Sequence, residues 1–176
     1  MRWAIGLVFL ASAAIAAHFA TLHLVPSVIM NRAQSVMAER GVPLYQWTAS
    51  PRQTPQTQTV VRPSPDLSYA VCRFNTEDGP VLLSAPAWDD YGSLSVFDKQ
   101  TNNVLVANLS GQSASVILYP YGQPPESDGR RYNGSNVRMI EVQGEGIALI
   151  RRLAPNQQKY DQAATLAADS QCAQIK

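Results

Sequence analysis

A nearly uninterrupted apolar run at the N-terminus, from Trp3 to Val25, constrains this chain more than any other feature. No charged side chain follows Arg2 within the run. Crossing the hydrocarbon core of a bilayer takes about 20 apolar residues of helix, and the run meets that length. It predicts a transmembrane helix over residues 1–26, ended by Pro26, which has no backbone N–H to continue the helix.

Two interpretations of this segment remain open. The basic start and the small residues around Ala14-Ile15-Ala16 fit a cleaved signal peptide. The alternative, an uncleaved signal anchor, is favoured because the run is longer than the apolar part of a usual signal peptide. Arg2 lies on one side and Arg32 and Arg40 on the other, so basic residues do not decide the orientation. We expect a cytoplasmic N-terminus, because short N-terminal segments of this kind usually direct the export of the chain after them.

The rest of the chain divides into three parts. Ser27 can begin and Gly41 can end a helix, which predicts a juxtamembrane helix over 27–41. Residues 42–64 are rich in Pro, Thr and Gln and are interpreted as a linker. Residues 65–176 carry short runs of alternating or continuous apolar residues, which predict a soluble domain.

This domain is predicted to be mainly β, a sandwich or jelly roll with a C-terminal helix. The dipeptide Asp78-Gly79 between two strand-like runs predicts a hairpin there. The helix is expected over 155–168. The predicted strands cover residues 69–74, 81–84, 93–97, 104–107, 114–119, 137–142 and 147–151.

Charge and histidine content limit the chemistry that this chain can perform. The net charge is +1, and no basic patch or nucleic-acid-binding motif is present, so nucleic acid is not an expected partner. The two histidines, His18 and His23, both lie in or beside the apolar run. A Ser-His or Cys-His nucleophile in the soluble part would therefore lack its base. Neither a metal nor a cofactor is predicted.

The chain has two cysteines, Cys72 and Cys172. They can form a disulfide or remain two buried thiols, and their spacing excludes a Cys-x-x-Cys redox motif. We favour a disulfide, which would fasten the C-terminal end to a strand of the domain.

One cluster of aromatic and acidic residues is a candidate ligand groove. It consists of Trp88, Asp89, Asp90 and Tyr91, with Asp98 further along the chain. Aromatic side chains beside carboxylates suit a small ligand, and paired carboxylates could serve a hydrolase. The competing interpretation is that the aromatic residues pack in the core and the acidic residues stabilise turns.

The segment from Pro65 to Asn108 has a Pro-Asp and Tyr opening, a Gly-Pro before a strand, an aromatic-rich strand ending in Asp98, and a Thr-Asn turn. These are Pro65-Asp66, Tyr69, Gly79-Pro80, Tyr91 to Asp98 and Thr101-Asn102. With these motifs the soluble part, from about Pro65 to Cys172, resembles the bacterial family catalogued as domain of unknown function 1254. Gly92 departs from the pattern, which usually has an aromatic residue after the tyrosine.

The resemblance is to the short, membrane-anchored version of that family. It implies a β-rich, jelly-roll-like fold and another envelope protein as partner, and it implies no reaction. We therefore expect a single-pass protein of the bacterial inner membrane. Its soluble domain would face the periplasm as a non-enzymatic accessory protein. A carboxylate-dependent hydrolase or a small-ligand-binding module is the alternative.

Overall fold

A computed structural model describes residues 2–54, 63–125 and 137–175. A long N-terminal helix, α1 (Arg2–Glu39), projects from a part of the chain that is mostly sheet. Among the described residues, it is the one helix long and apolar enough to cross a membrane. Its exposed apolar side chains contrast with the buried ones at its C-terminal end, such as Met30. The long apolar helix near the N-terminus is therefore confirmed.

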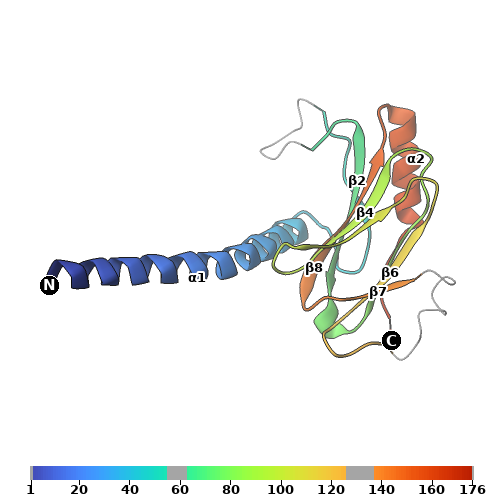
Figure 1. The fold of residues 1–176 in the computed structure, drawn as a ribbon. Coiled ribbons are helices and arrows are strands. Elements are labelled where there is room, and N and C mark those ends of the chain that lie inside the picture. Colours follow the sequence, from blue (N-terminus) through green and yellow to red (C-terminus); the bar gives the residue numbers. More distant parts are fainter. Residues whose placement is uncertain (1, 55–62, 126–136, 176) are drawn as a thin grey trace.

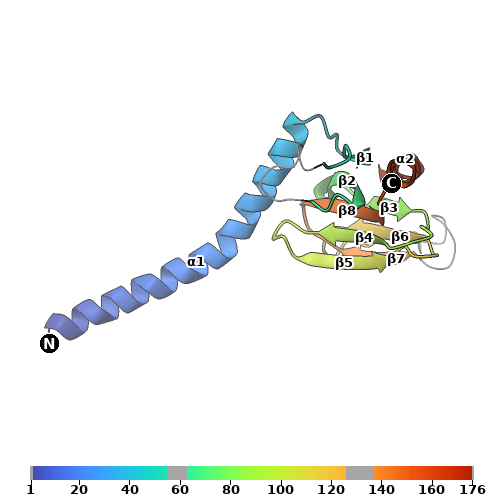
Figure 2. The same cartoon turned by 90° about the horizontal axis from the view of Figure 1, so that it is seen from above.

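Pro26 lies inside α1 and does not end it. The expected boundary between a span over 1–26 and a second helix over 27–41 thus falls within one continuous helix. Figure 2 shows α1 changing direction along its length, as a helix can at a proline that removes one hydrogen bond. The helix ends before Gly41, whose φ of 80° permits the left-handed turn that closes it.

The strands form two open sheets (Figure 2). The five-stranded sheet has the order β1-β2-β8-β4-β5, with every neighbouring pair antiparallel. The strand bounds in this sheet are β1 (Thr48–Ala49), β2 (Leu67–Asn75), β4 (Gly92–Phe97), β5 (Asn103–Asn108) and β8 (Glu145–Leu153). Two of its members, β2 and β8, are nine residues long and pair along their full length.

The four-stranded sheet has the order β7-β6-β3-β9. Its β6–β7 pair is parallel, and the other pairs are antiparallel. Its strands are β3 (Val81–Ala85), β6 (Ala114–Tyr119), β7 (Arg138–Glu141) and β9 (Gln171–Gln174). The mainly β fold and the positions of the predicted strands are confirmed, and the sequence pattern did not reveal β1 or β9.

One hydrophobic cluster draws side chains from both sheets. Alternate residues of β2, among them Ala70, Cys72 and Phe74, are buried in it, as expected of a strand with one face on the core. From the other sheet, Val81, Leu83, Val116 and Leu118 join the same cluster.

The predicted hairpin at Asp78-Gly79 is wrong. The strands on either side of this dipeptide, β2 and β3, belong to different sheets. A short 3-10 helix, η1 (Thr76–Asp78), begins with Asn75 accepting a hydrogen bond from the Glu77 amide and ends at Gly79. The buried Thr76 is held by the loop before β8, because its amide donates to the Gly144 carbonyl at 3.1 Å. These contacts turn the chain out of one sheet and into the other.

The C-terminal helix α2 (Gln157–Ala168) covers the β1–β2 end of the five-stranded sheet (Figure 1). Asn156 caps it by accepting a hydrogen bond from the Lys159 amide. Tyr160, Ala163 and Ala167 are its buried residues. The helix is therefore confirmed, with a start slightly later than expected.

The disulfide between Cys72 and Cys172 is confirmed. Cys72 lies on β2 and Cys172 on β9, so the bond joins the two sheets, and both residues are buried. Its Cα atoms lie 6.6 Å apart, within the usual range for a disulfide.

We expect the double substitution C72S/C172S to lower the free energy of unfolding by about 4–5 kcal/mol. The two cysteines are 100 residues apart. A disulfide that closes a loop of this length strongly restricts the unfolded chain, which lowers the entropy gained on unfolding. Urea unfolding of the full chain in detergent measures this loss. An unchanged midpoint for the double variant would contradict it, and the unsubstituted protein with reductant serves as the control.

Candidate functional site

The predicted groove residues from Trp88 to Tyr91 lie where the chain enters β4. The Trp88 indole is buried, and its Nε1 donates to the Leu153 carbonyl at 3.0 Å. Its amide donates to the Leu109 carbonyl at 2.8 Å. These bonds fix Trp88 between the end of β8 and the segment after β5. The indole therefore serves packing.

Lys159 of α2 links this cluster to the C-terminal helix. Its Nζ lies 5.0 Å from the centroid of a Trp88 ring and 3.1 Å from the Asp90 carboxylate. The side chains of Lys159 and Asp90 are 31% and 45% exposed, so solvent screens this ion pair. Lys159 thus pairs with Asp90, one of the carboxylates that the sequence suggested for catalysis.

A shallow cleft of about 430 Å³ lies between this cluster and α2. Trp88 and Asp89 line one wall, and Gln162, Thr165 and Leu166 of α2 line the other. Tyr91 is half exposed, and its hydroxyl lies 3.3 Å from that of Ser93. The structure therefore brings Trp88, Asp89 and Asp90 together, and Tyr91 beside them.

Asp98 lies apart from this cluster. It follows the far end of β4, roughly 20 Å away along a strand that rises about 3.3 Å per residue. Its carboxylate accepts hydrogen bonds from the amides of Gln100 and Asn102, at 2.9 and 2.8 Å. Asp98 thus caps the β4–β5 turn. Within the described residues, no group of three His, Cys, Asp or Glu side chains is placed to hold a metal.

Gly92 fits the space that the fold leaves for it. A Cβ built on this residue would lie 2.9 Å from the Leu109 Cβ and 3.2 Å from the Trp88 Cβ. Real Cβ atoms rarely approach so closely, and so the aromatic residue that is usual at this place in the resembled family would force these neighbours apart. Gly92, which departs from the family pattern, therefore allows Trp88 and Leu109 to pack closely at this place.

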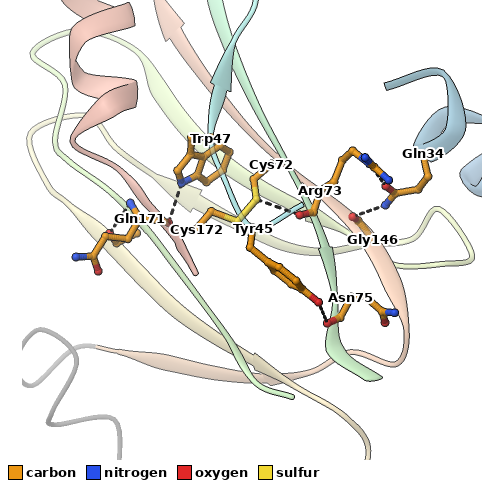
Figure 3. Close-up of a disulfide and its surroundings, with 10 residues drawn as sticks. Gln34, Tyr45, Trp47, Cys72, Arg73, Asn75, Gly146, Gln171 and Cys172 are labelled. Atoms are coloured by element: carbon orange, nitrogen blue, oxygen red, sulfur yellow. Dashed lines mark hydrogen bonds between the residues drawn. A yellow bond between two sulfur atoms is a disulfide. The ribbon is translucent and has the colours of Figure 1, made fainter. Parts of the chain in front are cut away.

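The second candidate site, which sequence reasoning missed, is the junction between α1 and the five-stranded sheet. We define this helix–sheet junction by Met30, Gln34, Arg73 and Gly146. The Gln34 amide is buried, and it donates to the Gly146 carbonyl at 2.6 Å (Figure 3). The same side chain accepts from the Arg73 Nε at 2.7 Å. Both ends of the Gln34 amide group thus have a partner on β2 or β8.

Arg73 extends the junction to the segment after α1. Its guanidinium also donates to the Val42 carbonyl at 2.9 Å, so one side chain fastens both the helix and the chain that leaves it. Gly146 itself is required by the core side of the sheet, because a Cβ there would lie 2.3 Å from the Phe74 ring and 2.5 Å from the Phe97 carbonyl oxygen. Nothing in the sequence around Gln34 distinguishes it from a glutamine that faces solvent.

Residues 44–49 fasten this part of the chain further, within the segment expected to be a linker. Tyr45, with a φ of 57°, places its hydroxyl 2.9 Å from the Asn75 carbonyl and 2.7 Å from the Asp78 carboxylate. Burial and the adjacent carboxylate raise the pKa of the Tyr45 phenol above its usual value. Trp47 donates from Nε1 to the Gln171 carbonyl at 2.7 Å, beside the disulfide (Figure 3).

Arg152 is a further residue whose burial the sequence did not predict. It points from β8 into the molecule and is 1% exposed. One guanidinium nitrogen donates to the Pro86 carbonyl at 3.1 Å, and Nε has no hydrogen-bond partner among the described residues. Burial lowers the pKa of Arg152 to about 10.

Comparisons with known proteins give a family and a similar fold. The family model described as "Protein of unknown function (DUF1254)" matches residues 45–174. The crystal structure of the VPA0106 protein from Vibrio parahaemolyticus has a TM-score of 0.61 at 12% identity, over 85% of this chain and 35% of that chain. An uncharacterized protein from Burkholderia cenocepacia matches at a TM-score of 0.36 and 12% identity, over 54% of this chain and 28% of its own. No curated protein gives a significant match.

We expect Trp88→Ala to lower the free energy of unfolding by about 3–5 kcal/mol, because it removes a buried indole and leaves a cavity. Asp90→Asn should change it by less than about 1 kcal/mol, since the Asp90–Lys159 pair is exposed to solvent. Urea unfolding of the two variants measures both effects. A large loss for Asp90→Asn would show that the pair contributes more than its exposure suggests.

The helix–sheet junction can be tested by Gln34→Ala. This change leaves Arg73 and the Gly146 carbonyl without their partner, and we expect a cost of about 1–3 kcal/mol. Amide hydrogen exchange should become faster at residues 30–40 and at the start of β8. Asn31→Ala, an exposed neighbour on the same helix, is the matched control. Equal exchange in the two variants would contradict a fixed junction.

Proposed function

The chain belongs to the DUF1254 family, and from that premise we propose that it is a membrane-anchored accessory protein of the bacterial envelope. In this proposal, α1 crosses the inner membrane once, with the N-terminus in the cytoplasm. The β-rich part lies in the periplasm and binds another envelope protein.

The helix–sheet junction is the observation that carries this proposal. A flexible tether would need no buried contact between the apolar helix and the sheet. Here Gln34, about two helical turns after the end of the expected span, is buried and doubly hydrogen-bonded to the folded part. A fixed junction holds the β-rich part at a defined height and orientation above the bilayer, which suits a protein that presents a surface to a neighbour.

The disulfide supports the periplasmic side of the membrane. Disulfides persist in oxidising compartments and are rare in the cytosol, where thiols are kept reduced. The Cys72–Cys172 bond links the two sheets at the core, so it contributes to folding rather than to a surface reaction.

The chain spans about a third of the length of the Vibrio parahaemolyticus protein whose fold it resembles. It covers 35% of that protein, which therefore continues well beyond the shared fold.

We also propose a more specific architecture for the β-rich part. Because one hydrophobic cluster includes side chains of both sheets, we describe the β-rich part as a sandwich. The chain crosses between the sheets at η1, and the disulfide joins β2 of one sheet to β9 of the other.

Membrane topology can be tested in intact cells with a thiol introduced at an exposed position. Asp169→Cys, after α2, should react with a membrane-impermeant maleimide without cell lysis, because the proposal places it in the periplasm. The matched control is Arg2→Cys at the other end of α1, which should react only after lysis. Labelling of both positions only after lysis would overturn the periplasmic assignment.

The proposed partner can be tested by crosslinking in native membranes, with identification of the crosslinked protein. The expected result is an envelope protein whose capture is lost in a variant that retains residues 1–41 but lacks the rest. Capture that persists with α1 alone would place recognition in the membrane and overturn a role for the β-rich part.

A further inference from the structure

The outermost strand of the five-stranded sheet, β5, has an edge that no described strand covers. Only its β4 side is paired in the ladder of strands that the structure describes. Edge strands expose unpaired backbone N–H and C=O groups, and soluble proteins usually protect them with charged residues, prolines or short lengths. The residues of β5 are Asn103, Val104, Leu105, Val106, Ala107 and Asn108, without a charge or a proline.

The other three edge strands are protected. The β1 strand has only two residues. The β7 strand begins with Arg138 and ends with Glu141, and β9 is a four-residue strand with glutamine at both ends. By contrast, β5 has six residues, and its Val106 side chain is 57% exposed. It is the one edge of the described sheets that combines length, apolar character and exposure.

We propose that β5 pairs antiparallel with β5 of a second copy of this chain, so that two five-stranded sheets become one continuous sheet. Identical strands can pair antiparallel across a two-fold axis perpendicular to the sheet. Side chains that face each other across such a pair must lie on the same face of the sheet. Among the registers that keep five of the six residues of β5 paired, two meet this condition. One centres on Val106, and the other centres on Leu105 and sets Val104 opposite Val106 of the second copy.

Either register would bury Val106, the most exposed large apolar residue of this sheet. In both, the charge-free sequence of β5 meets itself without like-charge repulsion. The asparagines at its two ends lie at the margin of the pairing, where their side chains can reach water.

The direction of α1 agrees with such a pair. The helix leaves the five-stranded sheet on the side opposite the four-stranded sheet (Figure 1). A two-fold axis perpendicular to the sheet therefore sends the helices of both copies to the same side, as two copies in one membrane require. Figure 2 shows α1 passing from the β1–β2 side of the sheet to beyond the β5 edge. The two helices would thus converge.

The proposed contact is small, and anchoring both copies in one membrane would favour it. Pairing of one six-residue edge buries less than the roughly 800 Å² per partner of a standard interface. Such a contact is weak between freely diffusing molecules. Two copies held in one membrane plane by α1 have a much higher effective concentration, which favours a small contact of this kind. This argument uses the proposed anchoring by α1 but not the proposed partner protein.

Cysteine crosslinking of the full chain in lipid nanodiscs or native membranes tests the pairing. We expect Val106→Cys to form a dimer under mild oxidation if the register centres on that residue. If the register centres on Leu105, a mixture of the Val104→Cys and Val106→Cys proteins should crosslink instead. Met139→Cys on β7, the edge of the other sheet, is the matched control and should stay monomeric. Absence of crosslinking in both β5 arrangements, or equal crosslinking of the control, would overturn the proposal.

A second measurement covers the case in which an added thiol disturbs the edge. Val106→Lys places a charge on the strand and should abolish the dimer seen by mass photometry in detergent or nanodiscs. Val106→Thr keeps a β-branched side chain and should retain it. A monomeric unsubstituted protein, or a dimer unaffected by Val106→Lys, would overturn the proposal. Because this readout does not depend on which membrane α1 crosses, a failure of the periplasmic assignment leaves it interpretable.

Discussion

The bond between Cys72 and Cys172 ties together two sheets whose strands form separate hydrogen-bond ladders. Without it, β9 would be a four-residue edge strand that pairs with β3 alone among the described strands. The bond fixes β9 against β2, and Trp47 then adds a hydrogen bond to the Gln171 carbonyl next to it. The covalent link thus adds to the β3 ladder in fixing the C-terminal end, next to which Trp47 fastens the chain that enters the sheet.

A second constraint connects the folded part to α1. The Gln34 amide satisfies Arg73 and the Gly146 carbonyl together, so a rotation of the helix would leave buried polar groups without partners. The same arginine reaches the Val42 carbonyl, and Tyr45 contacts η1. The orientation of the sheets relative to α1 is thus set by a chain of polar contacts. The direction in which the β5 edge faces depends on that orientation.

Part of the candidate site could be predicted and part could not. The proximity of Trp88 to Asp89 and Asp90 was predictable from their closeness in sequence. Asp98 was grouped with them as a further carboxylate that could act beside Asp89 and Asp90, yet the length of β4 separates it. Lys159 reaches the cluster from α2, a contact between residues 69 positions apart that no local pattern encodes. Gln34 and Arg73 were missed for the same reason.

The sequence by itself determined the long apolar helix, the positions of most strands and the C-terminal helix, because these depend on local composition and on the period of apolar residues. It also limited the chemistry, since both histidines lie in or beside the apolar run. Only the tertiary structure decided that β2 and β3 belong to different sheets, although a turn dipeptide joins them. It also decided that Arg152 is buried, that Pro26 lies within one helix, and that β5 ends its sheet. Such outcomes depend on contacts between distant segments, and sequence periodicity carries no information about which segments meet.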